Sequence, residues 1–180
     1  MNDGPIFESG MQFGPYKDGH CFHVEKSQFY ASVQDGIQIA ELVLLKANAT
    51  GAKTLFIIEA KSSTPSPGNA QHFQQFVDEI RSKLLHGFLI VNSLRLPRHA
   101  KHQQDLPDPF KEVDLSSANY RFALVVNGHK KEWLPPLQEA IYRSLSPLIK
   151  IWNISPNAVI VFNHELAEKH GIAKPVEPQQ

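Results

Sequence analysis

The chain has 180 residues, of which 42% are hydrophobic and 20% are charged. This length favours one domain that buries its own core, and the composition excludes an intrinsically disordered chain. Eighteen basic and eighteen acidic residues cancel, which excludes a uniformly basic nucleic-acid-binding domain.

The sequence also predicts a compartment. No apolar stretch approaches the ~20 residues of a transmembrane helix. The N-terminal sequence MNDGPIFESG has neither the basic start nor the apolar core of a signal peptide. The single cysteine, Cys21, cannot form an internal disulfide, as is common in a reducing compartment. We therefore expect a cytoplasmic protein.

Residues 1–19 are rich in glycine and proline and predict an irregular N-terminal arm. Such an arm packs on the domain or exchanges with a partner. Residues 20–172 are expected to form the single α/β domain. Residues 173–180 predict a flexible tail.

The segment after Cys21 predicts a short strand or helix start, followed by a helix that Ser27 caps. Glu25 is a candidate for an additional acidic site residue, and a surface charge is the alternative. His20, Cys21 and His23 are residue types that bind zinc. Because no second cluster with zinc-finger spacing follows, we do not expect a zinc site.

The segment Ile37–Ser63 predicts two apolar strands joined by a polar turn. Side chains alternate between the two faces of a strand, so Glu59 and Lys61 share a face with Leu55 and Ile57. A hairpin centred near residue 50 brings Glu41 opposite Glu59 on that face.

These charges predict a metal site. Magnesium prefers oxygen ligands and commonly takes one or two carboxylates, which Glu41 and Glu59 can supply. Lys61 can orient the attacking water, or accept its proton if burial lowers the lysine pKa. The alternative is a solvated ion pair at a strand end. Charged residues on a face that should be buried favour the site, because unpaired buried charge is costly.

At these residues the chain resembles the PD-(D/E)xK nuclease superfamily, which has the restriction-endonuclease-like fold. Glu59-Ala60-Lys61 matches the acid-x-lysine motif, and Ala40-Glu41 stands where the family usually has Pro-Asp. The resemblance implies that Glu41, Glu59 and Lys61 are catalytic. It also implies that the two glutamates and the Ala60 carbonyl bind Mg²⁺ or Mn²⁺.

The remaining elements follow from hydrophobic spacing. Apolar residues three and four apart predict helices over about 70–91 and 135–148. Apolar runs predict strands over 120–128, 149–154 and 157–163. Together with the hairpin, these elements predict a single α/β domain with a central mixed sheet flanked by helices.

Arg95, Arg98 and Lys101 form the densest basic group. Phosphate contacts dominate nucleic-acid affinity, so these residues are the candidate nucleic-acid-binding surface. A solvated loop is the alternative.

Three functions remain open from the sequence. The resemblance implies a metal-dependent nuclease that cuts DNA rather than RNA, works as a homodimer and acts in bacterial or phage defence. The second is a catalytically inactive module of the same fold that binds another protein, which the neutral net charge and Glu41 favour. The third is an enzyme of unrelated chemistry.

Overall fold

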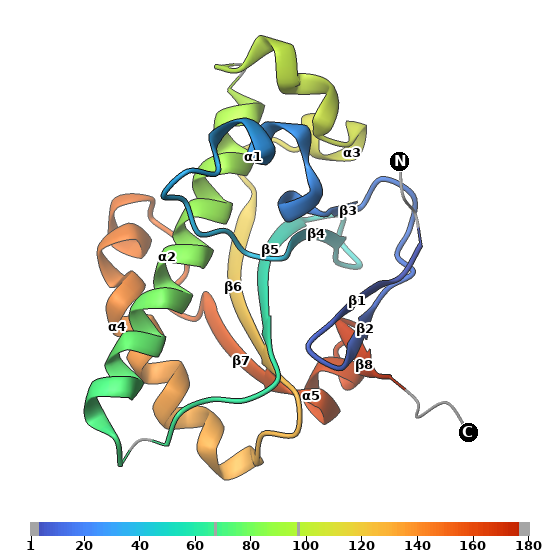
Figure 1. Cartoon of the computed structure of the whole chain (residues 1–180). Coiled ribbons are helices and arrows are strands. Elements are labelled where there is room, and N and C mark those ends of the chain that lie inside the picture. The colour runs from blue at the N-terminus through green and yellow to red at the C-terminus, as the bar shows by residue number, and fades with distance from the viewer. Residues whose placement is uncertain (1–3, 67, 97, 177–180) are drawn as a thin grey trace.

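A five-stranded mixed sheet runs through the centre of the computed structural model, which describes residues 4–66, 68–96 and 98–176 (Figure 1). Its order is β3 (Cys21–Phe22), β4 (Leu42–Ala47), β5 (Lys53–Lys61), β6 (Asn119–Val126) and β7 (Val159–Asn163). Strands β3, β4 and β5 pair antiparallel, and β5, β6 and β7 pair parallel. The α/β class with a central mixed sheet is confirmed.

The β4–β5 hairpin has the predicted register. Leu42 pairs with Ile58 and Ala47 with Lys53, so the hairpin is centred at residue 50. Asn48 accepts three hydrogen bonds through its side chain within the turn. The first strand is shorter than predicted: the predicted segment began at Ile37, and β4 begins at Leu42. Glu41 therefore lies immediately before its strand.

Two cores occupy opposite faces of the sheet. Leu55 and Ile57 belong to one core, while Ile58 and Ala60 belong to the other. This alternation confirms the predicted faces of β5. Glu59 and Lys61 therefore point to the same side as Leu55 and Ile57.

Two long helices cover the Glu59 face, α2 (Ala70–Arg95) and α4 (Leu134–Ile151), and they pack on each other (Figure 1). The predicted helices over 70–91 and 135–148 are confirmed; α2 extends further at its C-terminal end and α4 at both ends. Gly87 of α2 lies against the sheet, where an added Cβ would be 2.8 Å from Ile57 Cγ2. Glycine therefore lets α2 approach β5 closely.

The predicted strand over 149–154 is wrong. Residues up to Ile151 continue α4, whose buried stripe includes Leu145 and Ile149. A short apolar run can belong to a strand or to a helix. Here it continues the helical spacing of buried residues that begins at Leu137, so it is part of the helix. The predicted strands over 120–128 and 157–163 correspond to β6 and β7.

The N-terminal arm packs on the domain, which is one of the two alternatives, but it is not irregular. β1 (Ile6–Glu8) and β2 (Met11–Phe13) form a hairpin, and β2 pairs with β8 (Ala173–Pro175). Met11 and Phe13 are fully buried in the second core. Their burial offsets the conformational entropy that the arm loses when it is ordered. The predicted tail therefore begins with a strand, and residues 1–3 and 177–180 lie outside the described residues.

The smaller elements complete the layers. They are η1 (Val24–Lys26), α1 (Gln28–Val33), η2 (Ala100–Asp105), α3 (Asp108–Lys111), η3 (Lys131–Trp133) and α5 (His164–Lys169). Ser27 caps α1 as predicted, since its side chain accepts a hydrogen bond from the Tyr30 backbone N–H. None of the helices in the described ranges has the length and hydropathy needed to span a bilayer.

Candidate functional site

The carboxyl end of β5 carries a fully buried carboxylate. The Glu59 side chain has no exposed surface, and its Oε1 atom lies 3.4 Å from Lys61 Nζ. Lys61 also donates a hydrogen bond of 2.7 Å to Glu79 Oε1 of α2. Glu59 and Lys61 therefore sit side by side, as predicted, and both face helix α2.

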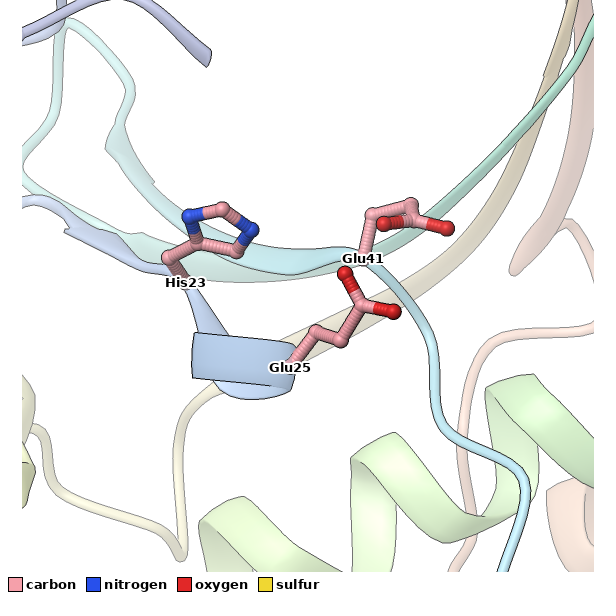
Figure 2. A group of neighbouring side chains, drawn as sticks. All are labelled: His23, Glu25 and Glu41. Carbon is pink, nitrogen blue, oxygen red and sulfur yellow. The ribbon is translucent and has the colours of Figure 1, made fainter. Parts of the chain in front are cut away.

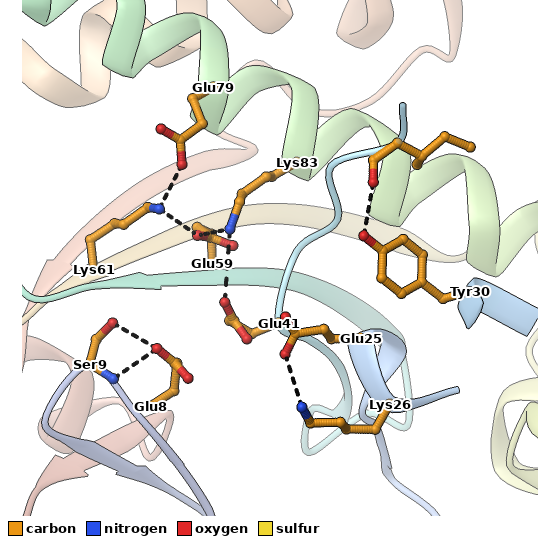
Figure 3. A network of polar contacts seen from close by, with 11 residues as sticks. Glu8, Ser9, Glu25, Lys26, Tyr30, Glu41, Glu59, Lys61, Glu79 and Lys83 are labelled. Carbon is orange, nitrogen blue, oxygen red and sulfur yellow. Dashed lines mark hydrogen bonds and ion pairs between the residues drawn. The ribbon is translucent and has the colours of Figure 1, made fainter. Parts of the chain in front are cut away.

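Lys83 of α2 joins the two predicted acids. Its Nζ atom lies 2.8 Å from Glu59 Oε1 and 3.9 Å from Glu41 Oε1 (Figure 3). Glu59 from β5 and Glu41, the residue just before β4, thus point toward one ammonium group. The convergence expected from the hairpin register is present in the side chains.

A second group of possible ligands shares Glu41. His23, Glu25 and Glu41 each offer one ligand atom, and these atoms lie within 4.8 Å of one another (Figure 2). His23 and Glu25 come from the connection between β3 and α1, where Glu25 also pairs with Lys26 at 3.8 Å. Glu41 is therefore the residue that links the sheet to this connection.

The network leaves one buried oxygen without a partner. Within the described part of the chain, Glu59 Oε2 makes no hydrogen bond, although buried polar atoms are usually satisfied. Among the residues that the structure places, Glu41, Glu59 and Glu79 face two ammonium groups, those of Lys61 and Lys83. When all three acids are ionised, one negative charge remains to be compensated.

Burial dominates the protonation of the acids. The pKa of Glu41 is raised to about 8, mainly by burial and then by the nearby charge of Glu59. Burial also raises the pKa of Glu59, while the ammonium groups of Lys83 and Lys61 oppose that shift. A cation at Glu41 would therefore have to displace a proton near neutral pH.

Lys61 does not have the lowered pKa that a general base needs. Burial acts to lower the pKa of Lys61, but the hydrogen bond to Glu79 and the charges of Glu59 and Glu79 outweigh it and raise the pKa. The condition under which Lys61 would accept a proton, a pKa lowered by burial, is therefore not met. A protonated Lys61 can still orient water or stabilise negative charge.

The donor set suits a hard divalent cation. Glu59 Oε2 and the Glu41 carboxylate are oxygen ligands of the kind that Mg²⁺ and Mn²⁺ prefer. Ala60 can offer only its backbone carbonyl oxygen, because an alanine side chain, here packed in the opposite core, has no ligand atom. His23 adds a nitrogen ligand, which suits Mn²⁺ better than Mg²⁺.

The basic group lies at the far end of α2. Arg95 is half-buried and donates a hydrogen bond to the Val113 carbonyl, whereas Arg98 and Lys101 are exposed. Lys83 and Arg95 are separated by about 18 Å along the helix axis. The structure therefore does not bring this group into the acidic site.

Sequence reasoning missed Glu79, Lys83 and His23. Glu79 and Lys83 are four residues apart on α2, next to the buried Ile80 and Leu84, and residues at this spacing share a helix face. That spacing is a signal that a helix covering β5 places charges opposite Glu59. His23 was considered only with its cysteine and histidine neighbours, and not with Glu25 and Glu41.

Comparison of the chain with protein-family models, with curated proteins and with solved structures found no match. The resemblance to the nuclease superfamily therefore rests on the residues of the site. The assignment of a function rests on the same geometry.

Proposed function

We propose that the chain is a metal-dependent nuclease that hydrolyses phosphodiester bonds in DNA. The observation that carries this proposal is the convergence of Glu41 and Glu59 on one cation, the Lys83 ammonium, at 3.9 and 2.8 Å. Two carboxylates that hold a cation in this way can also hold Mg²⁺ or Mn²⁺. The unpartnered Oε2 atom of Glu59 supports a further positive partner.

Each residue has a distinct task in this proposal. Glu41, Glu59 and the Ala60 carbonyl would hold the divalent ion, in the place that the Lys83 ammonium now has beside Glu41. The ion supplies Lewis-acid activation of water and compensates charge on the phosphoryl group. Lys61 remains protonated and positions the attacking water or the phosphate oxygen. Glu79 fixes the Lys61 ammonium in place through their hydrogen bond.

The expected biological setting comes from the resemblance. A restriction-endonuclease-like fold, a homodimer that cuts both strands and a role in bacterial or phage defence are parts of the proposal. RNA is the second choice of substrate.

One observation favours a second function. A proton on Glu41, whose pKa is raised to about 8, leaves Glu59 and Glu79 facing Lys61 and Lys83, so the charges of the network can be balanced without a metal ion. Together with the neutral net charge, this supports a catalytically inactive interaction module that retains the fold.

A paired assay with Lys61→Ala tests the nuclease. Binding of DNA is measured in chelator, and cleavage is then measured after adding Mg²⁺ or Mn²⁺. The variant should bind DNA and lose cleavage activity by about 100-fold or more, since one preorganised charge is removed. Lys53→Ala is the matched control, because Lys53 begins the same strand.

Two results would contradict the proposal. Full activity of Lys61→Ala removes the proposed role of this lysine. Absence of binding to both DNA and RNA at low salt favours the interaction module. If Lys61→Ala fails to fold, its main role is to compensate Glu59, and the loss of such a partner costs about 3–5 kcal/mol. Lys61→Arg, which keeps the charge, then serves for the activity assay.

A further inference from the structure

A cavity of about 450 Å³ lies at the edge of the sheet where β5 and β6 end. Its walls are the segment Ser62–Ser66, the segment Asn127–His129, and the side chains of Phe73, Trp133 and Leu137. The cavity has the size of a small-molecule site. The carboxyl ends of parallel strands are where open α/β sheets bind ligands.

The cavity opens on the same face of the sheet as the acidic site. Phe73 belongs to α2 and Leu137 to α4, the two helices that cover this face (Figure 1). Ser62 directly follows Lys61, and the Asn127 backbone N–H donates a hydrogen bond of 3.0 Å to the Lys61 carbonyl. A substrate phosphate at Lys61 would therefore have its neighbouring nucleotide at this cavity.

The aromatic wall suits a flat, uncharged ring. The Trp133 side chain is 50% exposed although it lines the cavity, and an exposed tryptophan gains by covering its ring. Lys130 Nζ lies 4.9 Å from the centroid of the Trp133 ring. A base stacked on the Trp133 ring would therefore have the Lys130 ammonium close by, and this ammonium can pair with the phosphate next to the base.

A polar group in the wall needs a partner. His129 Nε2 is buried and makes no hydrogen bond among the residues that the structure describes. Burial lowers the pKa of His129, while a hydrogen bond with the Trp133 backbone opposes the shift, so the imidazole is neutral at pH 7. A neutral imidazole nitrogen can exchange one hydrogen bond with the edge of a base.

We propose that this cavity binds one unstacked base of a single-stranded DNA segment, next to the phosphodiester held at Lys61. The inference rests on the proposed nuclease function and specifies its substrate class. A base in a duplex has both faces stacked and its pairing edge occupied, so it cannot stack on Trp133 and meet His129. Single strands, loops and frayed ends offer such a base.

The two tryptophans of the chain permit a direct test. Trp152→Phe leaves Trp133 as the only tryptophan, and Trp133→Phe leaves Trp152, which lies at the other end of α4 against Phe88. Each variant is titrated in chelator with an oligothymidylate of about ten nucleotides. Fluorescence of Trp133 should be quenched, and that of Trp152 should not change.

Affinity gives a second readout. Trp133→Ala should weaken binding of the oligothymidylate by about tenfold or more, while binding of a blunt duplex stays unchanged. An oligonucleotide of the same length whose bases are removed should bind without quenching Trp133. This titration separates recognition of the base from recognition of the phosphate.

The outcomes distinguish this inference from the proposed function. Quenching of Trp133 without cleavage under any metal ion keeps the base site and removes the nuclease. Cleavage without a response of Trp133, or equal weakening of single-stranded and duplex binding in Trp133→Ala, removes the base site and keeps the nuclease. Equal quenching of both tryptophans also overturns the inference.

Discussion

Glu41 is the residue on which both groups of possible ligands depend. It shares Lys83 with Glu59 on one side and lies beside His23 and Glu25 on the other. The carboxylates of Glu25, Glu41 and Glu59 thus lie close together, two of them buried. Their mutual repulsion favours the binding of protons or metal ions between them. The protonation state of Glu41 therefore reports on the site even without a substrate.

Glu41→Gln should change how stability depends on pH. The pKa of Glu41 is raised from 4.5 to about 8 in the folded chain, so between these values the folded state binds the proton more tightly than the unfolded state. The resulting stability is fully present below pH 4.5 and is lost as the pH rises through 8. The variant has no such proton and should keep this part of its stability.

The measurement is the free energy of urea unfolding of both proteins, below pH 4.5 and above pH 8. The wild type should lose more stability across this interval than Glu41→Gln. Glu112→Gln changes an exposed glutamate and should follow the wild type. Parallel pH profiles for the wild type and Glu41→Gln would show that the pKa of Glu41 is the same in the folded and the unfolded chain, which would contradict the prediction.

At the scale of elements, the distance between α2 and the sheet determines whether Glu79 and Lys83 can reach Lys61 and Glu59. Gly87 permits the contact with Ile57 and Ala40, and Lys83 and Glu79 lie one and two turns earlier on the same helix. A helix held further from β5 could not bring both side chains to Glu59 and Lys61. The site therefore depends on a residue that carries no charge.

Gly87→Ala should destabilise the protein although alanine favours helices. The gain in helix propensity is about 1 kcal/mol. The added Cβ would lie 2.8 Å from Ile57 Cγ2 and 3.2 Å from Ala40 Cβ, and overpacking of a core costs about 1–3 kcal/mol. We expect a net loss in the free energy of unfolding, measured in urea.

Gln75→Ala is the control for this comparison, because Gln75 is exposed on the same helix. It should alter stability by no more than about 0.5 kcal/mol. A Gly87→Ala protein as stable as the control would mean that α2 can move outward without cost.

The elements also show what sequence patterns can and cannot predict. The alternation around Ile57 and the turn at residue 50 are local, so the hairpin register and the face of Glu59 could be predicted. Lys83 joins the site through the packing of α2 on β5, which depends on contacts distant in sequence. For Met11 and Phe13 the partner strand β8 lies more than 150 residues away, so their pairing had no local signal.

At the scale of the whole molecule, charge is distributed unevenly although the totals cancel. Acidic side chains gather around Glu41 and Glu59, and the exposed Arg98 and Lys101 lie beyond the far end of α2. A nucleic acid that contacts both regions must extend along this helix.

Arg98→Ala combined with Lys101→Ala should test that path. If both side chains contact phosphates, the double variant should weaken DNA binding in chelator for all sequences alike. The slope of log affinity against log salt should fall by about 0.9 for each lost contact. Arg95 is left unchanged because it supports the Val113 backbone. Lys111→Ala and Lys150→Ala, at exposed sites elsewhere, provide the control.

An unchanged salt slope in the double variant would place the DNA path elsewhere. The next candidate is the exposed pair Lys130 and Lys131 beside the cavity.

The pairing of β2 with β8 joins residues near the two ends of the described chain. During synthesis the β1–β2 hairpin leaves the ribosome more than 150 residues before its partner strand Ala173–Pro175. The part of the second core that Met11 and Phe13 share with Ala173 can therefore form only after translation has passed β8. A chain that stops before β8 would leave this core incomplete and would offer its apolar side chains to chaperones and proteases.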